Sequence, residues 1–187
     1  MKKKSFFESG EFSKVLAGDV IQAKKRMEDD PSDSHRREFV RTTYSAIEAQ
    51  NWQLKMYLID HVLDKKTASI HEMSALREES YAINDKGEIY IQPKGYSLKV
   101  SLRLVTTTLK KYEIPIQVDF GSEDWKNIDH VLKIRNRVIH PKSLADISVS
   151  KDEADRCYRA FVYVNNILVA TILDSALSSI NKAIQKR

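Results

Sequence analysis

The chain has 187 residues, of which 42% are hydrophobic and 30% are charged, and its formal net charge at pH 7 is +5. This length and composition indicate an ordinary globular protein with one full core, too short for two large domains. The single cysteine, Cys157, excludes an internal disulfide and a zinc site built from several cysteines.

No targeting or membrane segment is expected. The N-terminal sequence MKKKSFF has basic residues but no apolar run after them, unlike a signal peptide. The most apolar segment, residues 161–173, is interrupted by Asn165 and Asn166 and is too short to span a bilayer. We therefore expect a cytoplasmic protein without membrane contact. The positive net charge allows a polyanionic partner without requiring one.

Residues 1–33 are predicted to form an N-terminal helical appendage, and residues 34–187 the main domain. The apolar residues of the appendage fit a helix that ends near Met27, before a polar segment that contains Pro31. From about residue 34 to residue 63, apolar residues recur at helical spacing. Glu48 lies at the edge of this apolar face. It is a candidate partner for a buried arginine, although an exposed glutamate is the default.

The middle of the chain carries signals for two helices with a hairpin between them. Ser69 and Glu72 form a capping box that begins a helix over about residues 70–82. The sequence of residues 83–91 indicates a turn that leads into a short strand, which predicts a small β-hairpin near residues 83–92. Another helix is predicted over residues 97–112.

The stretch from Trp125 to Ser143 is the most informative part of the sequence. At about 100° per residue, its apolar residues lie on one face of a helix that Ser122 can cap. Arg135 lies in the middle of that face, where an unpaired charge is costly. Arg137 is expected to point to the opposite side, toward solvent.

A proline should end this helix. Because the residue before a proline is disfavoured in the helical conformation, Pro141 predicts a helix end near Ile139. His140 is then released into a bend. The sequence thus gathers a guanidinium, an amide and an imidazole at one helix end, which makes it a candidate site.

Ser150 and Glu153 form another capping box, which begins a last helix from Lys151 to near the C-terminus. Its apolar residues fall on two faces. The first face includes Cys157, which we predict to be a buried core residue rather than a nucleophile. The second face is predicted to contact another subunit in a homodimer and consists of Tyr163, Ala170, Leu177 and Ile184. The predicted fold is all-α, an up-and-down bundle of four to five main helices with the hairpin as a small insertion.

The sequence Arg135-Asn136-Arg137-Val138-Ile139-His140 resembles the signature of the HEPN superfamily (higher eukaryotes and prokaryotes nucleotide-binding). That signature is an arginine, usually a polar residue next, and then a histidine after four to six intervening residues. The resemblance implies a HEPN-like bundle over residues 34–187, with residues 1–33 and the hairpin as additions. HEPN domains usually dimerise and bring two motifs to a shared cleft. Many are metal-independent endoribonucleases of toxin–antitoxin, abortive-infection and other defence systems.

The resemblance implies that Arg135, Asn136 and His140 are catalytic. They would cleave RNA by attack of a 2′-hydroxyl, leaving a 2′,3′-cyclic phosphate, without a metal or cofactor. The residue types suit this chemistry, because imidazole exchanges protons near neutral pH and guanidinium binds phosphate oxygens. The expected partners are RNA, a second subunit and an antitoxin protein. Three further cations are expected to contact RNA, namely Lys133, Arg137 and Lys142, and Glu48 is the candidate partner of Arg135.

Two other hypotheses remain open at this stage. In one, the chain is a non-catalytic HEPN-like module that binds RNA, a nucleotide or a protein partner. In the other, the motif is structural. Arg135 then pairs with a buried carboxylate, Asn136 caps backbone carbonyls, and His140 is a turn residue. The sequence contains no metal-binding motif, glycine-rich phosphate loop or paired-carboxylate motif.

Overall fold

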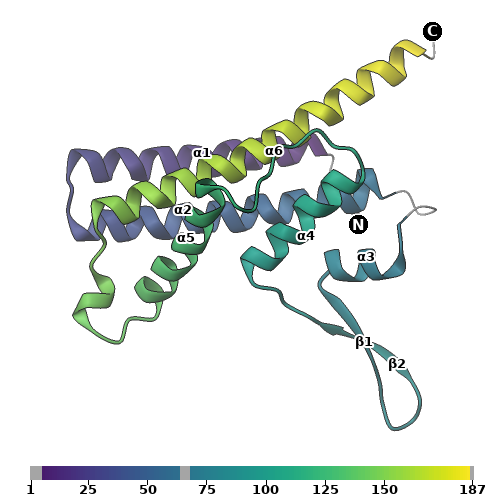
Figure 1. Cartoon of the computed structure of the whole chain (residues 1–187), viewed down its shortest axis with the longest axis horizontal. Coiled ribbons are helices and arrows are strands. Elements are labelled where there is room, and N and C mark those ends of the chain that lie inside the picture. The colour runs from purple at the N-terminus through teal and green to yellow at the C-terminus, as the bar shows by residue number, and fades with distance from the viewer. Residues whose placement is uncertain (1–5, 64–67, 186–187) are drawn as a thin grey trace.

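The computed structural model describes residues 6–63 and 68–185 and shows a mostly helical bundle with a projecting two-stranded hairpin (Figure 1). Three long helices form the body of the bundle: α1 (Phe6–Asp29), α2 (Asp33–Tyr57) and α6 (Lys151–Gln185). Two shorter helices, α4 (Leu98–Lys111) and α5 (Glu123–Ile139), pack against α2, and α5 also packs against α6. The short helix α3 (Ile70–Leu76) leads into the hairpin.

Polar contacts fix the relative direction of the long helices. Ser13 of α1 donates to Gln53 of α2 at 2.7 Å, while Arg26, near the other end of α1, pairs with Glu38. The helices α1 and α2 are therefore antiparallel. In contrast, α6 runs in the same direction as α2, with the Gln50 amide donating to Asn165 at 2.8 Å and the α2 N-terminus beside the α6 N-terminus (Figure 1).

Serine side chains begin most of these helices, and the cap at Ser122 was predicted from the sequence. The hydroxyls of Ser32, Ser97 and Ser122 each accept a backbone N–H from the first turn of the helix that follows. Both predicted capping boxes are confirmed: Ser69 with Glu72 at α3, and Ser150 with Glu153 at α6. Each cap satisfies backbone donors that the first turn of a helix leaves without an intrahelical partner.

The predicted helix over residues 70–82 is wrong beyond Leu76. Helix α3 ends there, and Glu78 has a φ of 56°, a left-handed conformation that no helix continues through. The chain then forms strand β1 (Glu79–Ile83), which pairs in antiparallel fashion with β2 (Ile89–Pro93). The pairing satisfies backbone groups in a segment whose residues Tyr81 and Ile83 favour strands. The predicted hairpin is confirmed and is longer than expected.

The helix predicted over residues 34–63 is confirmed as α2, but its last turn differs. From Leu58 to Val62 the chain forms a wider π-helical turn, closed by a bond from the Leu63 N–H to the Leu58 carbonyl at 2.9 Å. The helix predicted over residues 97–112 is confirmed as α4, and the last predicted helix as α6.

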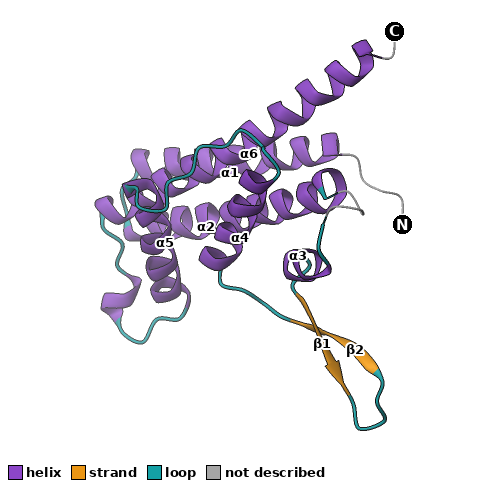
Figure 2. Cartoon of the chain, turned by 45° about the vertical axis from the view of Figure 1, so that its right-hand side comes forward, coloured by secondary structure: helices purple, strands orange, loops and turns teal. Residues whose placement is uncertain are grey.

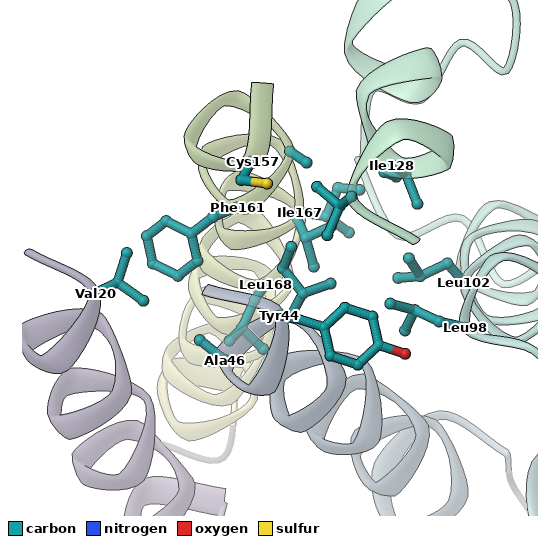
Figure 3. Packing of buried hydrophobic residues seen from close by; sticks show 14 of the residues in the cluster. Val20, Tyr44, Ala46, Leu98, Leu102, Ile128, Cys157, Phe161, Ile167 and Leu168 are labelled. Carbon is teal, nitrogen blue, oxygen red and sulfur yellow. The ribbon is translucent and has the colours of Figure 1, made fainter. Parts of the chain in front are cut away.

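One apolar core joins all the long helices (Figure 3). Figure 3 shows Val20 of α1 facing Phe161 of α6, and Leu102 of α4 facing Ile128 of α5. Val20 is fully buried, so α1 shares the core of the remaining helices, whereas the boundary at residue 33 stays a prediction. Cys157 is also fully buried.

The second apolar face predicted for α6 is not one free surface. The Tyr163 ring lies against Trp125 of α5, with ring centroids 6.5 Å apart, and its side chain is half-buried. Ala170 is half-buried, Leu177 is 61% exposed, and the side chain of Ile184 lies outside the described residues. Among the side chains that the structure describes in the C-terminal half of α6, the exposed large apolar residues are Val169, Leu173 and Leu177. Dimerisation itself stays a prediction.

Candidate functional site

Helix α5 holds the motif at its C-terminal end, beside α2 and the start of α6 (Figure 1). Ser122 begins this helix, and the buried residues of α5 are Trp125, Asn127, Ile128, Val131, Ile134 and Val138. Four of the six residues predicted for the apolar face are buried: Trp125, Ile128, Val131 and Val138. The other two differ, because Leu132 is half-buried and Ile139 is 38% exposed at the helix end, while Asn127 and Ile134 are buried without having been predicted. The core thus fixes one face of α5 along most of its length, and at the last turn Asn136 and Ile139 are exposed.

The helix ends where the proline predicts. Ile139 is the last helical residue, and His140 follows with φ −121° and ψ 59°, outside the helical region. The backbone N–H of His140 donates to the Asn136 carbonyl at 3.0 Å and closes the last turn. The His140 and Asn136 side chains are both exposed. Both polar groups of the motif are therefore accessible to a large ligand.

Arg135 is half-buried and points toward α2. Its guanidinium lies over the ring of Tyr44, with the Arg135 Cζ 4.8 Å from the ring centroid. One end of the guanidinium, Nη1, donates to the Asn136 side-chain oxygen at 3.1 Å, while the buried Nε has no hydrogen-bond partner. A cation over an aromatic face is attracted by the negative π-surface, so Tyr44 supplies both a support and part of the electrostatic stabilisation of Arg135.

Glu48 does not pair directly with Arg135. The ion pairs of the described residues include neither side chain, and Glu48 is exposed. Burial and a hydrogen bond to Glu48 together raise the pKa of Tyr44 to about 12, against the opposing charge of Arg135. Tyr44 therefore stands between the two charged groups and links them. The sequence placed Glu48 near Arg135 but did not identify the tyrosine between them.

Arg137 is not free in solvent, contrary to the sequence-based expectation. Its Nη2 pairs with the Glu153 carboxylate at 2.7 Å, and its Nη1 donates to the Ala145 carbonyl at 3.4 Å. Arg137 thus ties α5 to the first turn of α6 and to the loop before it. The remaining predicted RNA contacts, Lys133 and Lys142, are exposed.

The loop after the motif is ordered by one carboxylate. Asp146, in the short 3₁₀ helix Leu144–Ile147, accepts the Lys142 backbone N–H and the Ser143 hydroxyl, each at 2.9 Å. These bonds to the ionised form lower the pKa of Asp146. The chain directly after Pro141 is consequently held in a compact turn.

Arg41 is an exposed cation beside the motif that the sequence analysis did not single out. Arg37, Arg41 and Tyr44 share one side of α2, because residues three and four apart are neighbours on a helix. Arg37 donates to the Ile147 carbonyl at 3.1 Å, and Tyr44 lies under Arg135. Arg41 lies between these two residues in the chain, and therefore on the side of α2 that faces the motif region of α5. Its spacing was visible in the sequence, but the packing of α2 beside α5 was not.

Other parts of the described chain do not form a comparable site. A hollow of about 450 Å³ lies at the opposite end of α5, lined by two acids, Asp119 and Asp124, and one base, Lys110, whose ammonium already donates to the Val118 carbonyl. The excess of negative charge disfavours a phosphate there. Burial raises the pKa of the Cys157 thiol to about 12, which disfavours the nucleophilic thiolate. Within residues 6–63 and 68–185, no group of three or more His, Cys, Asp or Glu residues is arranged to hold a metal ion. Over the same residues, no helix has the length and apolar character needed to cross a membrane.

Comparison with known proteins gives no match: no protein family, no curated protein and no solved structure is similar to this chain.

Proposed function

We propose that the chain is a metal-independent endoribonuclease of HEPN type, with Arg135, Asn136 and His140 as its catalytic residues. The observation that supports this proposal most directly is the environment of the Arg135 side chain. It is a half-buried guanidinium held over Tyr44, with a buried Nε that has no protein partner. A buried donor without a partner costs about 1–3 kcal/mol, so such groups often have a functional reason. Here the exposed imidazole of His140 follows five residues later, directly after the end of α5.

The proposed reaction is a transesterification within the RNA backbone. The 2′-oxygen attacks the adjacent phosphorus, the bond from phosphorus to the 5′-oxygen breaks, and a 2′,3′-cyclic phosphate and a 5′-hydroxyl form. His140 accepts the proton of the 2′-hydroxyl or donates a proton to the leaving 5′-oxygen. Arg135 stabilises the negative charge on the non-bridging oxygens, and Asn136 orients the guanidinium through the 3.1 Å bond to it.

A second subunit completes this scheme. One chain supplies one motif histidine, whereas the reaction needs both a base and an acid. A homodimer that brings two motifs to one cleft supplies a His140 for each role. A toxin or defence context, with an antitoxin as partner, is part of the same proposal and follows from the resemblance of the motif.

A non-catalytic role in binding RNA is the second candidate, and one observation favours it. A catalytic imidazole is usually oriented by a hydrogen bond to its second nitrogen. Among the described contacts, the His140 ring makes no such bond, and only its backbone N–H is bound. In this case Arg135 and its neighbours hold RNA phosphates and no bond is broken.

One experiment tests both candidates. Labelled single-stranded RNA is incubated with pure protein in excess chelator, next to the variants His140→Ala and Arg135→Ala. Two control variants each remove an exposed group outside the motif: His71→Ala removes an imidazole in α3, and Lys126→Ala removes a cation at the opposite end of α5. We expect the motif variants to lose about 100-fold or more in cleavage rate, as for loss of a general acid or base, and the controls to retain activity.

Product analysis sharpens this test. Cleavage should leave a 2′,3′-cyclic phosphate and should stop when the 2′-hydroxyl at the cleaved position is replaced by hydrogen. Equal cleavage by wild type and all variants would show a contaminating nuclease. Binding that Arg135→Ala weakens, with no product from the wild type at any RNA concentration, would establish the binding role instead.

A further inference from the structure

The loop between α5 and α6, residues 141–150, is fixed to the rest of the chain at several points, and we call it the motif loop. Three arginines donate to alternate backbone carbonyls of this loop: Arg137 to Ala145 at 3.4 Å, Arg37 to Ile147 at 3.1 Å and Arg36 to Val149 at 3.4 Å. Asp146 accepts two further bonds from the first residues of the loop, each at 2.9 Å. The Val149 side chain is fully buried. The motif loop is therefore held in one conformation from both sides.

This fixed loop presents apolar side chains to solvent next to the motif histidine. Leu144 is 85% exposed, the highest value for a large apolar side chain within residues 6–63 and 68–185. Ile139 is 38% exposed, and Pro141 is exposed as well. His140 thus has an exposed apolar residue on each side of it and a third one four residues later. A lone exposed leucine needs no explanation, but a local apolar surface at a candidate site indicates contact with a ligand.

The cations near the motif are available to bind phosphate. Lys133, Lys142 and Arg41 are exposed and take part in none of the ion pairs within the described residues. Two acids nearby are already bound, because Glu153 pairs with Arg137 and Asp146 holds the motif loop. Free cations beside exposed apolar side chains match the two parts of a nucleotide, its phosphate and its base.

Leu144 lies within reach of a nucleotide that is bound at His140. The four residues from one to the other span at most about 14 Å when fully extended. The bond from the Lys142 N–H to Asp146 keeps this segment more compact than that. The short 3₁₀ helix that begins at Leu144 contacts α5, and Figure 2 shows both at one end of the bundle, with the hairpin at the other.

We propose that Leu144 is an apolar wedge that separates the two bases on either side of the scissile phosphate. This inference rests on the proposed nuclease function. Displacement at phosphorus requires the attacking and leaving oxygens to be roughly in line. In stacked RNA, the 2′-oxygen lies to the side of the phosphorus and not opposite the leaving 5′-oxygen. A base that is turned out of the stack frees its sugar to rotate into the required alignment. Leu144 contacts a base in this step and transfers no proton.

The leucine and the contacts that hold its loop meet the two requirements for a wedge. A wedge must be apolar, because it replaces the contact between two stacked bases, and leucine is among the side chains that proteins insert between base steps. It must also be fixed, because a mobile segment would move aside instead of opening the stack. Arg37, Arg137 and Asp146 provide this second property.

The wedge also defines a class of substrate. Both bases must be unpaired, because a partner strand would hold them in the stack. Opening the stack costs least at a flexible step, which is a pyrimidine followed by a purine. The preferred substrate is therefore unpaired RNA, cut between a pyrimidine and a purine.

Fluorescence of 2-aminopurine tests the wedge without any cleavage. The probe is a single-stranded RNA of about ten nucleotides in which 2-aminopurine follows a uridine whose sugar is 2′-deoxy, so that the RNA binds but cannot be cut. When wild type saturates the probe, the fluorescence should rise about threefold or more as the base leaves the stack. Leu144→Ser should remove most of this rise at full saturation, whereas Leu144→Met should retain it. The control Leu173→Ser, at a residue 57% exposed on α6, should match wild type.

Cleavage kinetics provide a second readout. On RNA with a uridine–adenosine step, Leu144→Ser should lower kcat about tenfold and change KM less than about threefold, because the wedge acts on alignment. When an abasic nucleotide replaces the adenosine, no stack has to be opened, and wild type and Leu144→Ser should cleave at the same rate. A purely structural role of Leu144 would lower both rates alike. Because Leu144 is exposed, its variants should keep the wild-type circular dichroism.

The outcomes separate failure of the wedge from failure of the nuclease function. Probe binding without a fluorescence rise, or with an equal rise in Leu144→Ser, would overturn the wedge alone. So would an equal loss of kcat on the abasic RNA. A rise that depends on Leu144, together with no cleavage of unmodified RNA, would support the wedge within a binding site and overturn the nuclease function. No binding of the probe would overturn both, as would binding through Leu144 to phosphatidylserine vesicles in place of RNA.

Discussion

Tyr44 should control both the stability and the activity that depend on Arg135. The structure places the guanidinium 4.8 Å from the ring centroid of a tyrosine that is 7% exposed. A partly desolvated cation–π contact is worth about 1–2 kcal/mol. Tyr44→Leu removes this contact and part of a well-packed ring, a packing loss of about 1 kcal/mol. We therefore expect a loss of about 2–3 kcal/mol in the free energy of unfolding, as the sum of these two terms.

Tyr44→Phe is the matched control. It keeps the ring under Arg135 and removes only the hydroxyl that bonds to the exposed Glu48. Such a bond contributes about 0.5–1 kcal/mol, so the phenylalanine variant should lose less than about 1 kcal/mol. Urea unfolding followed by circular dichroism measures both values. In RNA cleavage, Tyr44→Leu should lower the rate about tenfold or more through misplacement of the guanidinium, and Tyr44→Phe by less than about threefold.

A double-mutant cycle isolates the contact itself. Arg135→Met keeps the apolar stem and removes the charge, and its combination with Tyr44→Leu should show a coupling free energy of about 1 kcal/mol. Coupling within error of zero, or equal losses for the leucine and phenylalanine variants, would refute the assignment of Tyr44 as the support of Arg135.

Two other residues give direct predictions. Arg41→Ala should weaken RNA binding about threefold to tenfold and lower its salt dependence, because one phosphate contact is lost, while Lys126→Ala changes neither in a filter-binding titration. An unchanged affinity would place the RNA elsewhere. Cys157 should resist thiol reagents at pH 8 until urea unfolds the chain, because burial raises its pKa from 9.0 to about 12. Since the folded state holds this proton more tightly, the stability from the neutral thiol is complete below pH 9 and falls as the pH rises toward 12. Rapid reaction of the native protein would contradict the buried position.

The local features of the fold could be predicted because their causes are local. A serine before a helix and a proline after it act within one turn, so Ser122 and Pro141 fix both ends of α5. The prediction of a helix over residues 70–82 was wrong because its end depends on a contact with a distant part of the chain. Its composition is compatible with a helix, but Glu78 takes a left-handed conformation where Lys55, 23 residues earlier, pairs with it. No local pattern contains that contact.

The candidate site divides in the same way. Helical periodicity correctly predicted that Arg135 points toward the bundle, because this prediction depends only on the spacing of residues within α5. The same periodicity predicted that Arg137 points to solvent. It could not reveal that the Glu153 carboxylate, at the start of α6, lies 2.7 Å from the Arg137 guanidinium. The role of Tyr44 could not be predicted from the sequence, because its contact with Arg135 depends on how α5 packs against α2.

Because α2 contacts the motif region, residues of α2 that are far from the motif in the sequence help to determine the shape of the site. Arg37 holds the loop after His140 through the Ile147 carbonyl, and Tyr44 supports Arg135. A scan of single substitutions along α2, scored by activity in variants of unchanged stability, should therefore show sensitive positions on this one side of the helix. In a comparison of related sequences, these α2 positions should vary together with the motif, although more than 90 residues separate Tyr44 from Arg135 in the chain. The six-residue motif together with these α2 positions should thus form one longer, discontinuous sequence signature.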